Sequence, residues 1–273
     1  MKNYTLFIIL LFLCACSSVK NQAENMSFEK RFDNAKLLFE SGKYEKAKNQ
    51  FQIIIENDKT SSLSLESYFL IGKAYLEIKD YEEALYHLNY FSMFSNDIVK
   101  VEEAQFLKSK CNFELTLDYK NDQTQTELAI KVIQEFLDNF PNTVYYSNAS
   151  DMIIDLRDKL AKKNYEDGRL YLKIKKYDSA LYYFDIVISE YYDTKYCDDS
   201  KISKIFTYIL SDDYDKAKAY YNQISDTFIS DNKKKEAKDM LSDFKSGLGL
   251  SGYYRLYKWI FFFTEGHLIL HTK

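Results

Sequence analysis

Histidine, cysteine and carboxylate side chains are the groups in this sequence that could do catalytic or metal chemistry, and their spacing favours neither. The chain has three histidines, His87, His267 and His271. His267 and His271 are four residues apart and would share one face of a helix, as metal-binding pairs do. The residues around them are mostly apolar. We therefore expect no catalytic residue, no metal site, no cofactor and no enzymatic activity.

Cys16 is the residue for which the sequence predicts a covalent modification. The apolar run Leu6–Leu13 follows Lys2 and is too short to span a bilayer, which is typical of a signal peptide. The next residues resemble the lipobox of bacterial lipoproteins, in which a small residue precedes the lipidated cysteine. We predict a signal peptide over 1–15, cleavage between Ala15 and Cys16, a lipid on Cys16, and a tether over 16–27. An ordinary secretory signal that contains cysteine is the alternative.

Composition excludes some classes of partner and favours helices. Lys and Arg number 37 against 41 Asp and Glu, so the chain lacks the basic excess that nucleic-acid binding requires. Pro141 is the single proline, and glycine is rare before residue 245, so few helix breakers are present. Cys111 and Cys197 lie in different predicted repeats, and we expect them to be packing cysteines rather than a bridge.

A recurring phrase that ends in alanine organises the chain. It reads GKYEKA, KDYEEA, QTELA, KKYDSA and DDYDKA, and an apolar or aromatic residue follows four positions after each alanine. The alanines are 37, 45, 51 and 37 residues apart. A period near ~34 with this phrase is typical of tetratricopeptide repeats, which are helix–turn–helix units that stack into a solenoid. The repeating alanines are Ala47, Ala84, Ala129, Ala180 and Ala217.

We predict an all-α solenoid of about five such repeats over residues 28–244. The repeats lie near 28–59, 65–96, 101–141, 161–192 and 198–229, and a polar insertion, Asp118–Gln125, splits the third. Residues 245–273 form an atypical aromatic tail. This tail could lie at a membrane interface, cap the last repeat, or be poorly ordered.

The first helices of the first two repeats share one pattern of side chains. At matching positions both have an acidic residue, a phenylalanine, a lysine, an apolar residue and a second acidic residue. Exposed aromatic rings beside a lysine could hold an extended peptide with aromatic side chains and a terminal carboxylate; packing of the phenylalanines between repeats is the alternative. The predicted peptide groove consists of Phe32, Lys36, Phe39, Phe69, Lys73 and Leu76.

Four further phrases resemble the BamD family of outer-membrane assembly lipoproteins. They are NDQT at 121–124, FPNT at 140–143, LRDKLA at 156–161 and YYDT at 191–194. The resemblance covers roughly residues 28–242. Tyr192 and Ile205 depart from the family pattern, which usually has proline and a small residue at these positions, and the tail matches nothing familiar.

The resemblance implies an outer-membrane location at the periplasmic face and a set of partners. BamD-like proteins work with the barrel protein BamA and other members of the assembly complex, and their N-terminal repeats are thought to meet unfolded β-barrel substrates. On this resemblance we expect a partner surface in the fourth and fifth repeats that includes Arg157, Asp158, Tyr165 and Arg169. The alternative for Arg157 and Asp158 is an exposed helix face with ordinary ion pairs. A repeat scaffold of another envelope complex, acting in cell-wall assembly or division, is the alternative function.

Overall fold

The computed structural model describes residues 26–58 and 61–246, and every regular element in this part of the chain is a helix. The prediction of an all-α array of tetratricopeptide type is confirmed. The predicted signal peptide, Cys16, most of the tether and the tail from residue 247 lie outside the described residues. The chain forms two compact units, and each is described by itself below.

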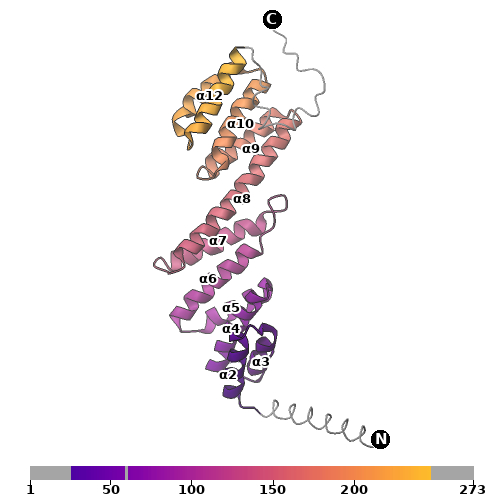
Figure 1. The fold of residues 1–273 in the computed structure, drawn as a ribbon, viewed down its shortest axis with the longest axis vertical. Helices are drawn as coiled ribbons and strands as arrows, with labels where there is room; N and C mark the ends of the chain where they lie inside the picture. The colour runs from indigo at the N-terminus through magenta and orange to yellow at the C-terminus, as the bar shows by residue number, and fades with distance from the viewer. Residues whose placement is uncertain (1–25, 59–60, 247–273) are drawn as a thin grey trace, which may run out of the picture. The chain divides into compact units, whose positions relative to one another are not determined.

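The first unit consists of residues 26–116 and 128–150 and is built from helices that pack on their neighbours in sequence (Figure 1). First helices of successive repeats also touch, since α2 contacts α4 and α4 contacts α6, as in a stack of helix pairs. Its helices are α2 (Phe28–Glu40), α3 (Tyr44–Asn57), α4 (Ser62–Glu77), α5 (Tyr81–Phe94), α6 (Ile98–Glu114), most of α7 (Thr124–Asn139) and the start of α8 (Tyr146–Lys173).

The second unit consists of residues 117–127 and 151–246. The predicted repeats end near residue 229, but a further helix, α12, packs on α10 and α11. Ala237, Met240 and Leu241 of this helix join the core of the unit, so α12 covers apolar surface that the last repeat would otherwise expose. The helices of this unit are the rest of α8, α9 (Tyr177–Glu190), α10 (Tyr196–Leu210), α11 (Tyr214–Ile224), the short 3₁₀ helix η1 (Ser225–Thr227) and α12 (Asp231–Lys245).

The repeating alanines belong to the cores of the helix pairs. All five are fully buried, and each lies one turn before a large side chain that fills the space beside it. In two repeats this large side chain lies against a glycine of the preceding helix. Leu88 lies against Gly72, and Phe184 lies against Gly168. The small residue and the large residue are therefore complementary parts of one contact.

The turns inside four helix pairs share one hydrogen-bonded geometry. In each turn one residue has a positive φ: Gly42 at 72°, Lys79 at 64°, Lys175 at 58° and Asp212 at 63°. The N–H of the next residue donates to the carbonyl five positions earlier, as Asp80 does to Tyr75 at 2.9 Å. This is a Schellman motif, which satisfies the last carbonyls of the first helix and reverses the chain within a few residues.

Polar caps fix where several helices begin. Ser61 accepts a hydrogen bond from the N–H of Ser64, and Asp97 accepts one from the N–H of Lys100. Asp213 does the same for Lys216. Such side chains pair N–H groups that have no partner inside the helix.

Candidate functional sites

Arg157 and Asp193 bring two of the singled-out phrases, LRDKLA and YYDT, into contact. Arg157 lies on α8, and its Nε and Nη2 donate to the two carboxylate oxygens of Asp193 at 3.1 and 2.6 Å. Nη2 also donates to the carbonyl of Glu190 at 2.8 Å, and the guanidinium lies over the ring of Tyr191. This bidentate geometry uses the planar fork of arginine. We call Arg157, Glu190, Tyr191 and Asp193 the turn clamp.

A second ion pair supports the turn clamp from the next residue of α8. Asp158 lies 2.8 Å from Nζ of Lys195, in the turn that leads to α10. Hydrogen bonding to Arg157 lowers the pKa of Asp193, and the hydrogen bond to Asp158 raises the pKa of Lys195. Arg157 and Asp158, two of the charged residues predicted for a partner surface, therefore hold the α9–α10 turn against α8. A role for them in partner binding stays a prediction.

The other two residues predicted for the partner surface differ in exposure. The ring of Tyr165 is buried against Phe184 and Tyr196, and burial raises its pKa to about 12. Its prediction as a surface residue is therefore wrong, because this side of α8 faces the core of the unit at Tyr165. Arg169 is half-buried and pairs with Glu166 at 2.8 Å.

The predicted peptide groove of the first unit is only partly exposed. Phe32 packs edge-on against Phe51, and Phe69 packs against Phe91. Both phenylalanines and Leu76 are buried, so the expectation of exposed aromatic rings is wrong at these positions. The rings of Phe32 and Phe69 contact the second helix of their own repeat, whereas the alternative interpretation had expected packing between repeats.

The remaining groove residues lie at the surface. Lys36 is exposed, and Phe39 is half-buried against Tyr44. Lys73 forms an ion pair with Glu103 of α6 at 2.7 Å, and a second pair joins Glu66 to Lys100 at 2.6 Å between the same two helices. These charges connect the first helices of two successive repeats. Peptide binding along this surface stays a prediction.

The polar insertion folds around one buried glutamine. The side-chain N–H groups of Gln123 donate to the carbonyls of Asp118 and Asn121 at 3.0 and 2.9 Å, and its oxygen accepts from Thr126. The same loop places Tyr119 under Nζ of Lys162, which lies 4.0 Å from the centre of the ring. The NDQT phrase thus specifies an ordered loop in the second unit.

A buried ion pair fixes another turn of the second unit. Asp198 accepts hydrogen bonds from the N–H groups of Ile229 and Ser230, and it pairs with Lys201 at 3.1 Å. Lys201 also donates to the carbonyl of Thr227 at 2.6 Å. The pair is almost fully buried, and these backbone hydrogen bonds satisfy groups that water would otherwise solvate. Sequence reasoning missed this site because its partners are backbone atoms.

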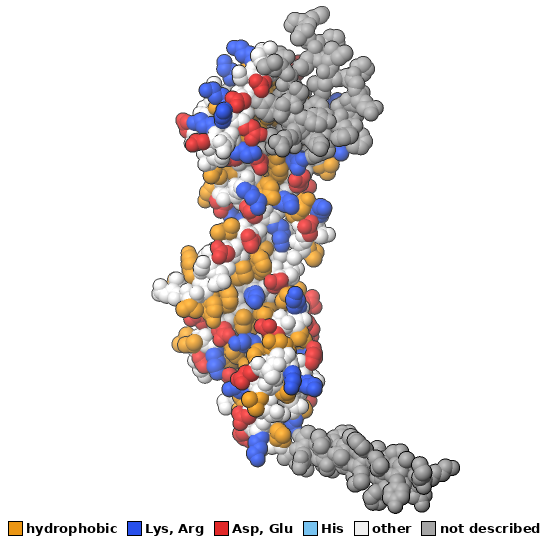
Figure 2. Space-filling view, viewed as in Figure 1, with side chains coloured by type: hydrophobic (Ala, Val, Ile, Leu, Met, Phe, Trp, Pro, Cys, Tyr) orange, Lys and Arg blue, Asp and Glu red, His pale blue; other side chains and the backbone are white. Residues whose placement is uncertain are grey.

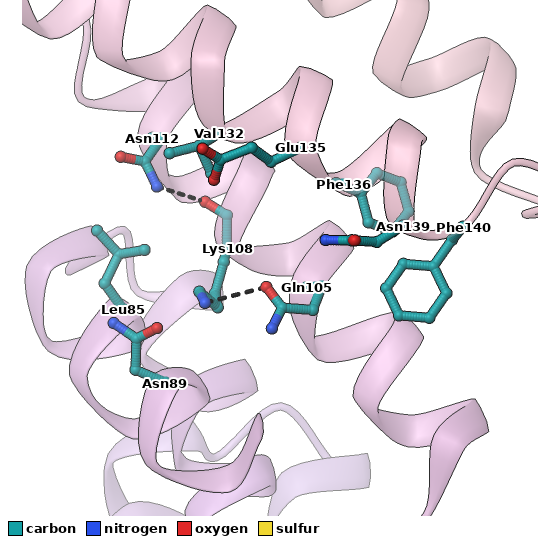
Figure 3. Close-up of a pocket in the computed structure, with 10 residues that line it drawn as sticks. All are labelled: Leu85, Asn89, Gln105, Lys108, Asn112, Val132, Glu135, Phe136, Asn139 and Phe140. Atoms are coloured by element: carbon teal, nitrogen blue, oxygen red, sulfur yellow. Dashed lines mark hydrogen bonds between the residues drawn. The ribbon is translucent and has the colours of Figure 1, made fainter. Parts of the chain in front are cut away.

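A pocket of about 450 Å³ lies in the first unit, where α5, α6 and α7 meet (Figure 3). The half-buried lysine Lys108 lines it together with four amide side chains. Sequence reasoning missed this pocket, although Gln105, Lys108 and Asn112 repeat at helical spacing and could have indicated a polar face. The amides are Asn89, Gln105, Asn112 and Asn139, and the other lining residues are Leu85, Val132, Glu135, Phe136 and Phe140.

The titratable groups offer no catalytic arrangement in the described part of the chain. His87 is buried among tyrosine rings, and desolvation lowers its pKa to about 4, so it is neutral at pH 7. Cys111 and Cys197 are buried free thiols, and burial raises the pKa of Cys111 to about 12. Across residues 26–58 and 61–246, His, Cys, Asp and Glu form no group of three that could hold a metal ion. His267 and His271 lie outside the described residues.

Charge and hydropathy at the surface are mixed. Acidic and basic side chains alternate over the face shown in Figure 2, and apolar side chains lie between them. Among the helices that the structure describes, none is both long enough and apolar enough to cross a bilayer.

Comparison with known proteins gives a consistent set of relatives. The family model YfiO, described as an outer membrane lipoprotein, matches residues 24–219. The outer membrane protein assembly factor BamD of Rickettsia prowazekii is 27% identical over 216 residues, which are 79% of this chain and 86% of that protein. BamD of Caulobacter vibrioides is also 27% identical, over 168 residues that cover 62% of this chain and 55% of that protein. A solved tetratricopeptide-repeat protein of Thermus thermophilus aligns with 13% identity and a TM-score of 0.34, covering 79% of this chain and 98% of that one.

Proposed function

The chain belongs to the YfiO family of outer membrane lipoproteins, and from this membership we propose that it is an assembly factor for outer membrane β-barrel proteins. It acts as a scaffold without catalysis. A lipid on Cys16 holds it at the periplasmic face of the outer membrane. It docks on a BamA-type barrel protein and joins the other members of the assembly complex, and it receives unfolded barrel substrates.

The extent of the family match carries this proposal. The match begins at residue 24 and ends at residue 219, so it spans the helices from α2 into α11 and not merely one repeat. The two BamD relatives are similar over a large part of the same region. Generic tetratricopeptide repeats share only small and large packing positions, whereas the match here extends over loops and turns as well.

The turn clamp explains in physical terms why the LRDKLA and YYDT phrases contain these charged residues. Arg157 and Asp158 of α8 fix the turn between α9 and α10 through Asp193 and Lys195. A scaffold binds through the relative placement of its helices, so contacts that fix a turn also fix the surface offered to a partner. We propose that the second unit docks on the barrel protein through this ordered surface and that the first unit receives the substrates.

Co-purification from membranes tests the proposal. The chain, tagged after Lys273, is recovered from detergent-solubilised membranes, and the bound proteins are identified by mass spectrometry. We expect a barrel protein with repeated periplasmic domains. Arg157→Ala releases the turn clamp and should reduce this recovery, whereas Lys218→Ala, at an exposed position of α11, should not.

Two results would contradict the proposal. Recovery of cell-wall enzymes without a barrel protein would favour the scaffold of another envelope complex. The Arg157→Ala variant could also fold normally by circular dichroism and recover as much barrel protein as the unchanged chain. That result would show that the surface held by the turn clamp does not dock on the barrel protein.

A further inference from the structure

Two turns of the first unit carry exposed apolar side chains. One is the turn where α5 ends and α6 begins, and the other is the turn between α7 and α8. The exposed fractions of these side chains lie between 55% and 85%. Single exposed apolar residues are normal, whereas a group of them marks a surface that contacts a protein or a membrane. We call the following residues the apolar edge: Met93, Phe94, Ile98, Val99, Val144 and Tyr146.

The two turns lie beside each other within the unit. The ring of Tyr145, in the α7–α8 turn, stacks on the ring of Phe106 of α6 with 4.2 Å between the ring centres. Burial raises the pKa of Tyr145, and the carboxylate of Glu103, about one turn after the start of α6, raises it further. Apolar side chains gather at the left margin of the first unit in Figure 2, beside these turns. The α7–α8 turn therefore extends the surface that begins at the α5–α6 turn.

The direction of the helices places the start of α2 at the same edge of the unit. α2 to α6 alternate in direction, because short turns join neighbours that pack on each other. The ion pair between Glu66 and Lys100 at 2.6 Å shows that the first turns of α4 and α6 lie together. The α2–α3 and α4–α5 turns lie at the opposite edge. Residues 41–43 and 78–80 of those turns are polar except for the half-buried Ile78 and the glycine Gly42.

The membrane anchor of the proposed function joins the unit at the apolar edge. Cys16 precedes Phe28, the first residue of α2, by twelve residues. Such a segment spans at most about 40 Å when it is fully extended. A lipid on Cys16 thus keeps the start of α2 near the bilayer surface. Tethering also raises the effective concentration of the apolar edge at that surface, so that even a weak contact is populated.

We propose that the apolar edge is a second membrane contact, whose side chains enter the interfacial region of the bilayer in which the lipid of Cys16 is anchored. The inference rests on the proposed function in taking Cys16 to be lipidated. The side chains project from turns and helix ends, so they can enter a fluid lipid layer without a complementary groove. Phenylalanine and tyrosine suit the interfacial region.

The charges beside the apolar edge favour contact through apolar burial rather than through attraction to anionic lipid. Lys100 pairs with Glu66 at 2.6 Å and lies 3.9 Å from Asp97. The side chain of Asp97 also accepts a hydrogen bond from the N–H of Lys100 and so caps α6. We therefore expect the contact to persist at high salt, which screens exposed charges.

An environment-sensitive dye tests the inference on the full, lipidated chain. The chain is purified from membranes, labelled at Met93→Cys or at the control position Lys43→Cys, and placed in vesicles of phosphatidylethanolamine and phosphatidylglycerol. Cys111 and Cys197 are buried, so the introduced thiol is the one that reacts. We expect the dye at position 93 to emit at shorter wavelength than the dye at position 43. Vesicles with brominated acyl chains should quench the emission at position 93 and leave that at position 43 unchanged.

A matched pair of variants locates the contact while the dye stays at position 93. The double variant Ile98→Ser and Val99→Ser removes two apolar side chains and should abolish the quenching by brominated lipid. Leu37→Ser replaces an exposed leucine near the end of α2, toward the opposite edge, and should leave the quenching unchanged. All three residues are exposed, and thermal unfolding checks that the variants remain folded.

The outcomes that would overturn the inference can be told apart. Absence of quenching at position 93 in the otherwise unchanged chain would overturn it. A shift in emission that grows with the number of chains per vesicle, without quenching by brominated lipid, would assign the apolar edge to a second copy of the chain instead. An intact mass without a lipid on Cys16 would remove the anchor on which the inference rests.

The result is also separable from that of the co-purification experiment. If a barrel protein is recovered but the dye at position 93 is not quenched, the membrane contact fails and the proposed function stands. If the dye is quenched but no barrel protein is recovered, the membrane contact stands and the proposed function fails.

Discussion

Gly72 and Gly168 allow a large side chain of the following helix to reach the helix backbone. A Cβ atom built on Gly72 would lie 2.6 Å from Cγ of Leu88 and 3.3 Å from its backbone nitrogen. A Cβ atom on Gly168 would lie 2.6 Å from the ring of Phe184. Leu88 and Phe184 are fully buried, so neither can move aside without disturbing its neighbours.

Gly72→Val should therefore destabilise the first unit. Valine has a somewhat better helix propensity than glycine, so the steric conflict decides the sign, and overpacking of this kind costs about 1–3 kcal/mol. The free energy of unfolding from urea titration measures this loss. Ala219→Val, at an exposed position of α11, is the control and should lower the value only by the difference in helix propensity, at most about 0.7 kcal/mol. An equal change in the free energy of unfolding of the two variants would show that the close approach of Leu88 to Gly72 does not cause the loss of stability.

The contribution of the turn clamp to stability depends on pH through the carboxylate of Asp193. Its folded-state pKa is lowered below the usual 3.8, chiefly by hydrogen bonding to Arg157. A lowered carboxylate pKa contributes stability above the unfolded-state value, and this contribution is lost as pH falls through the folded-state value. The side chain of Asp193 is 46% exposed, so screening by solvent keeps the contribution small.

Asp193→Asn should reduce the free energy of unfolding at pH 7 by up to about 1 kcal/mol. The difference from the unchanged chain should begin to shrink as pH falls below about 3.8 and should vanish below the lowered folded-state pKa, where the folded unchanged chain also lacks the charge. Urea titrations between neutral and acidic pH measure this convergence. Asp239→Asn on the exposed face of α12 is the control. A difference that stays constant down to acidic pH would assign the effect to packing.

At the scale of the elements, three of the four Schellman turns use a residue other than glycine at the left-handed position. Lys79, Lys175 and Asp212 have φ between 58° and 64°. A side chain makes this conformation unfavourable by roughly 1 kcal/mol, and glycine adopts it freely. Gly42 shows that the same turn accepts glycine.

Replacing Lys79, Lys175 and Asp212 with glycine should stabilise the chain. We expect up to about 1 kcal/mol for each turn, with nearly additive effects because the turns are independent. The added freedom of glycine in the unfolded chain reduces this gain. Thermal unfolding of the single and triple variants provides the measurement. Glycine at Lys46, inside α3, should instead destabilise, and a triple variant that melts lower than the unchanged chain would refute the expectation.

The helical repeats could be predicted from the sequence because the fold of each repeat depends on local patterns. The alanines, the large residues four positions later and the turn residues all act within one helix pair. The exposure of individual residues depends on neighbours far away in sequence, and there prediction failed for Phe32, Phe69 and Tyr165. The pocket around Lys108 was missed for the same reason, since three helices supply it.

At the scale of the whole molecule, the family match ends before the last described helix. α12 continues the packing of the second unit beyond residue 219. Cys16, which we expect to govern location, lies outside the described residues, and so does the tail. Because Cys16 precedes α2, it can be replaced without changing any residue of the described helices.

Cys16→Ser should move the protein from the membrane fraction to the soluble fraction without changing its thermal unfolding. Lipid acyl chains contribute about 0.8 kcal/mol for each buried methylene, so their loss removes most of the membrane affinity. Metabolic labelling with a radioactive fatty acid and cell fractionation measure the effect. Cys14→Ser should remain labelled. Labelling of the Cys16→Ser variant would place the lipid elsewhere.

The tyrosines that fill the spaces between helices also give this protein a useful optical property. The chain has 25 tyrosines but a single tryptophan, Trp259, which belongs to the tail. Excitation at the red edge of the aromatic absorption band selects the indole, so the emission comes from position 259 with no background from the repeats. Tyrosine emission, excited at shorter wavelength, reports chiefly on the helices. The unmodified protein therefore carries two spectroscopic probes, and a titration with lipid vesicles or a partner protein can follow the tail and the repeat array separately in one cuvette.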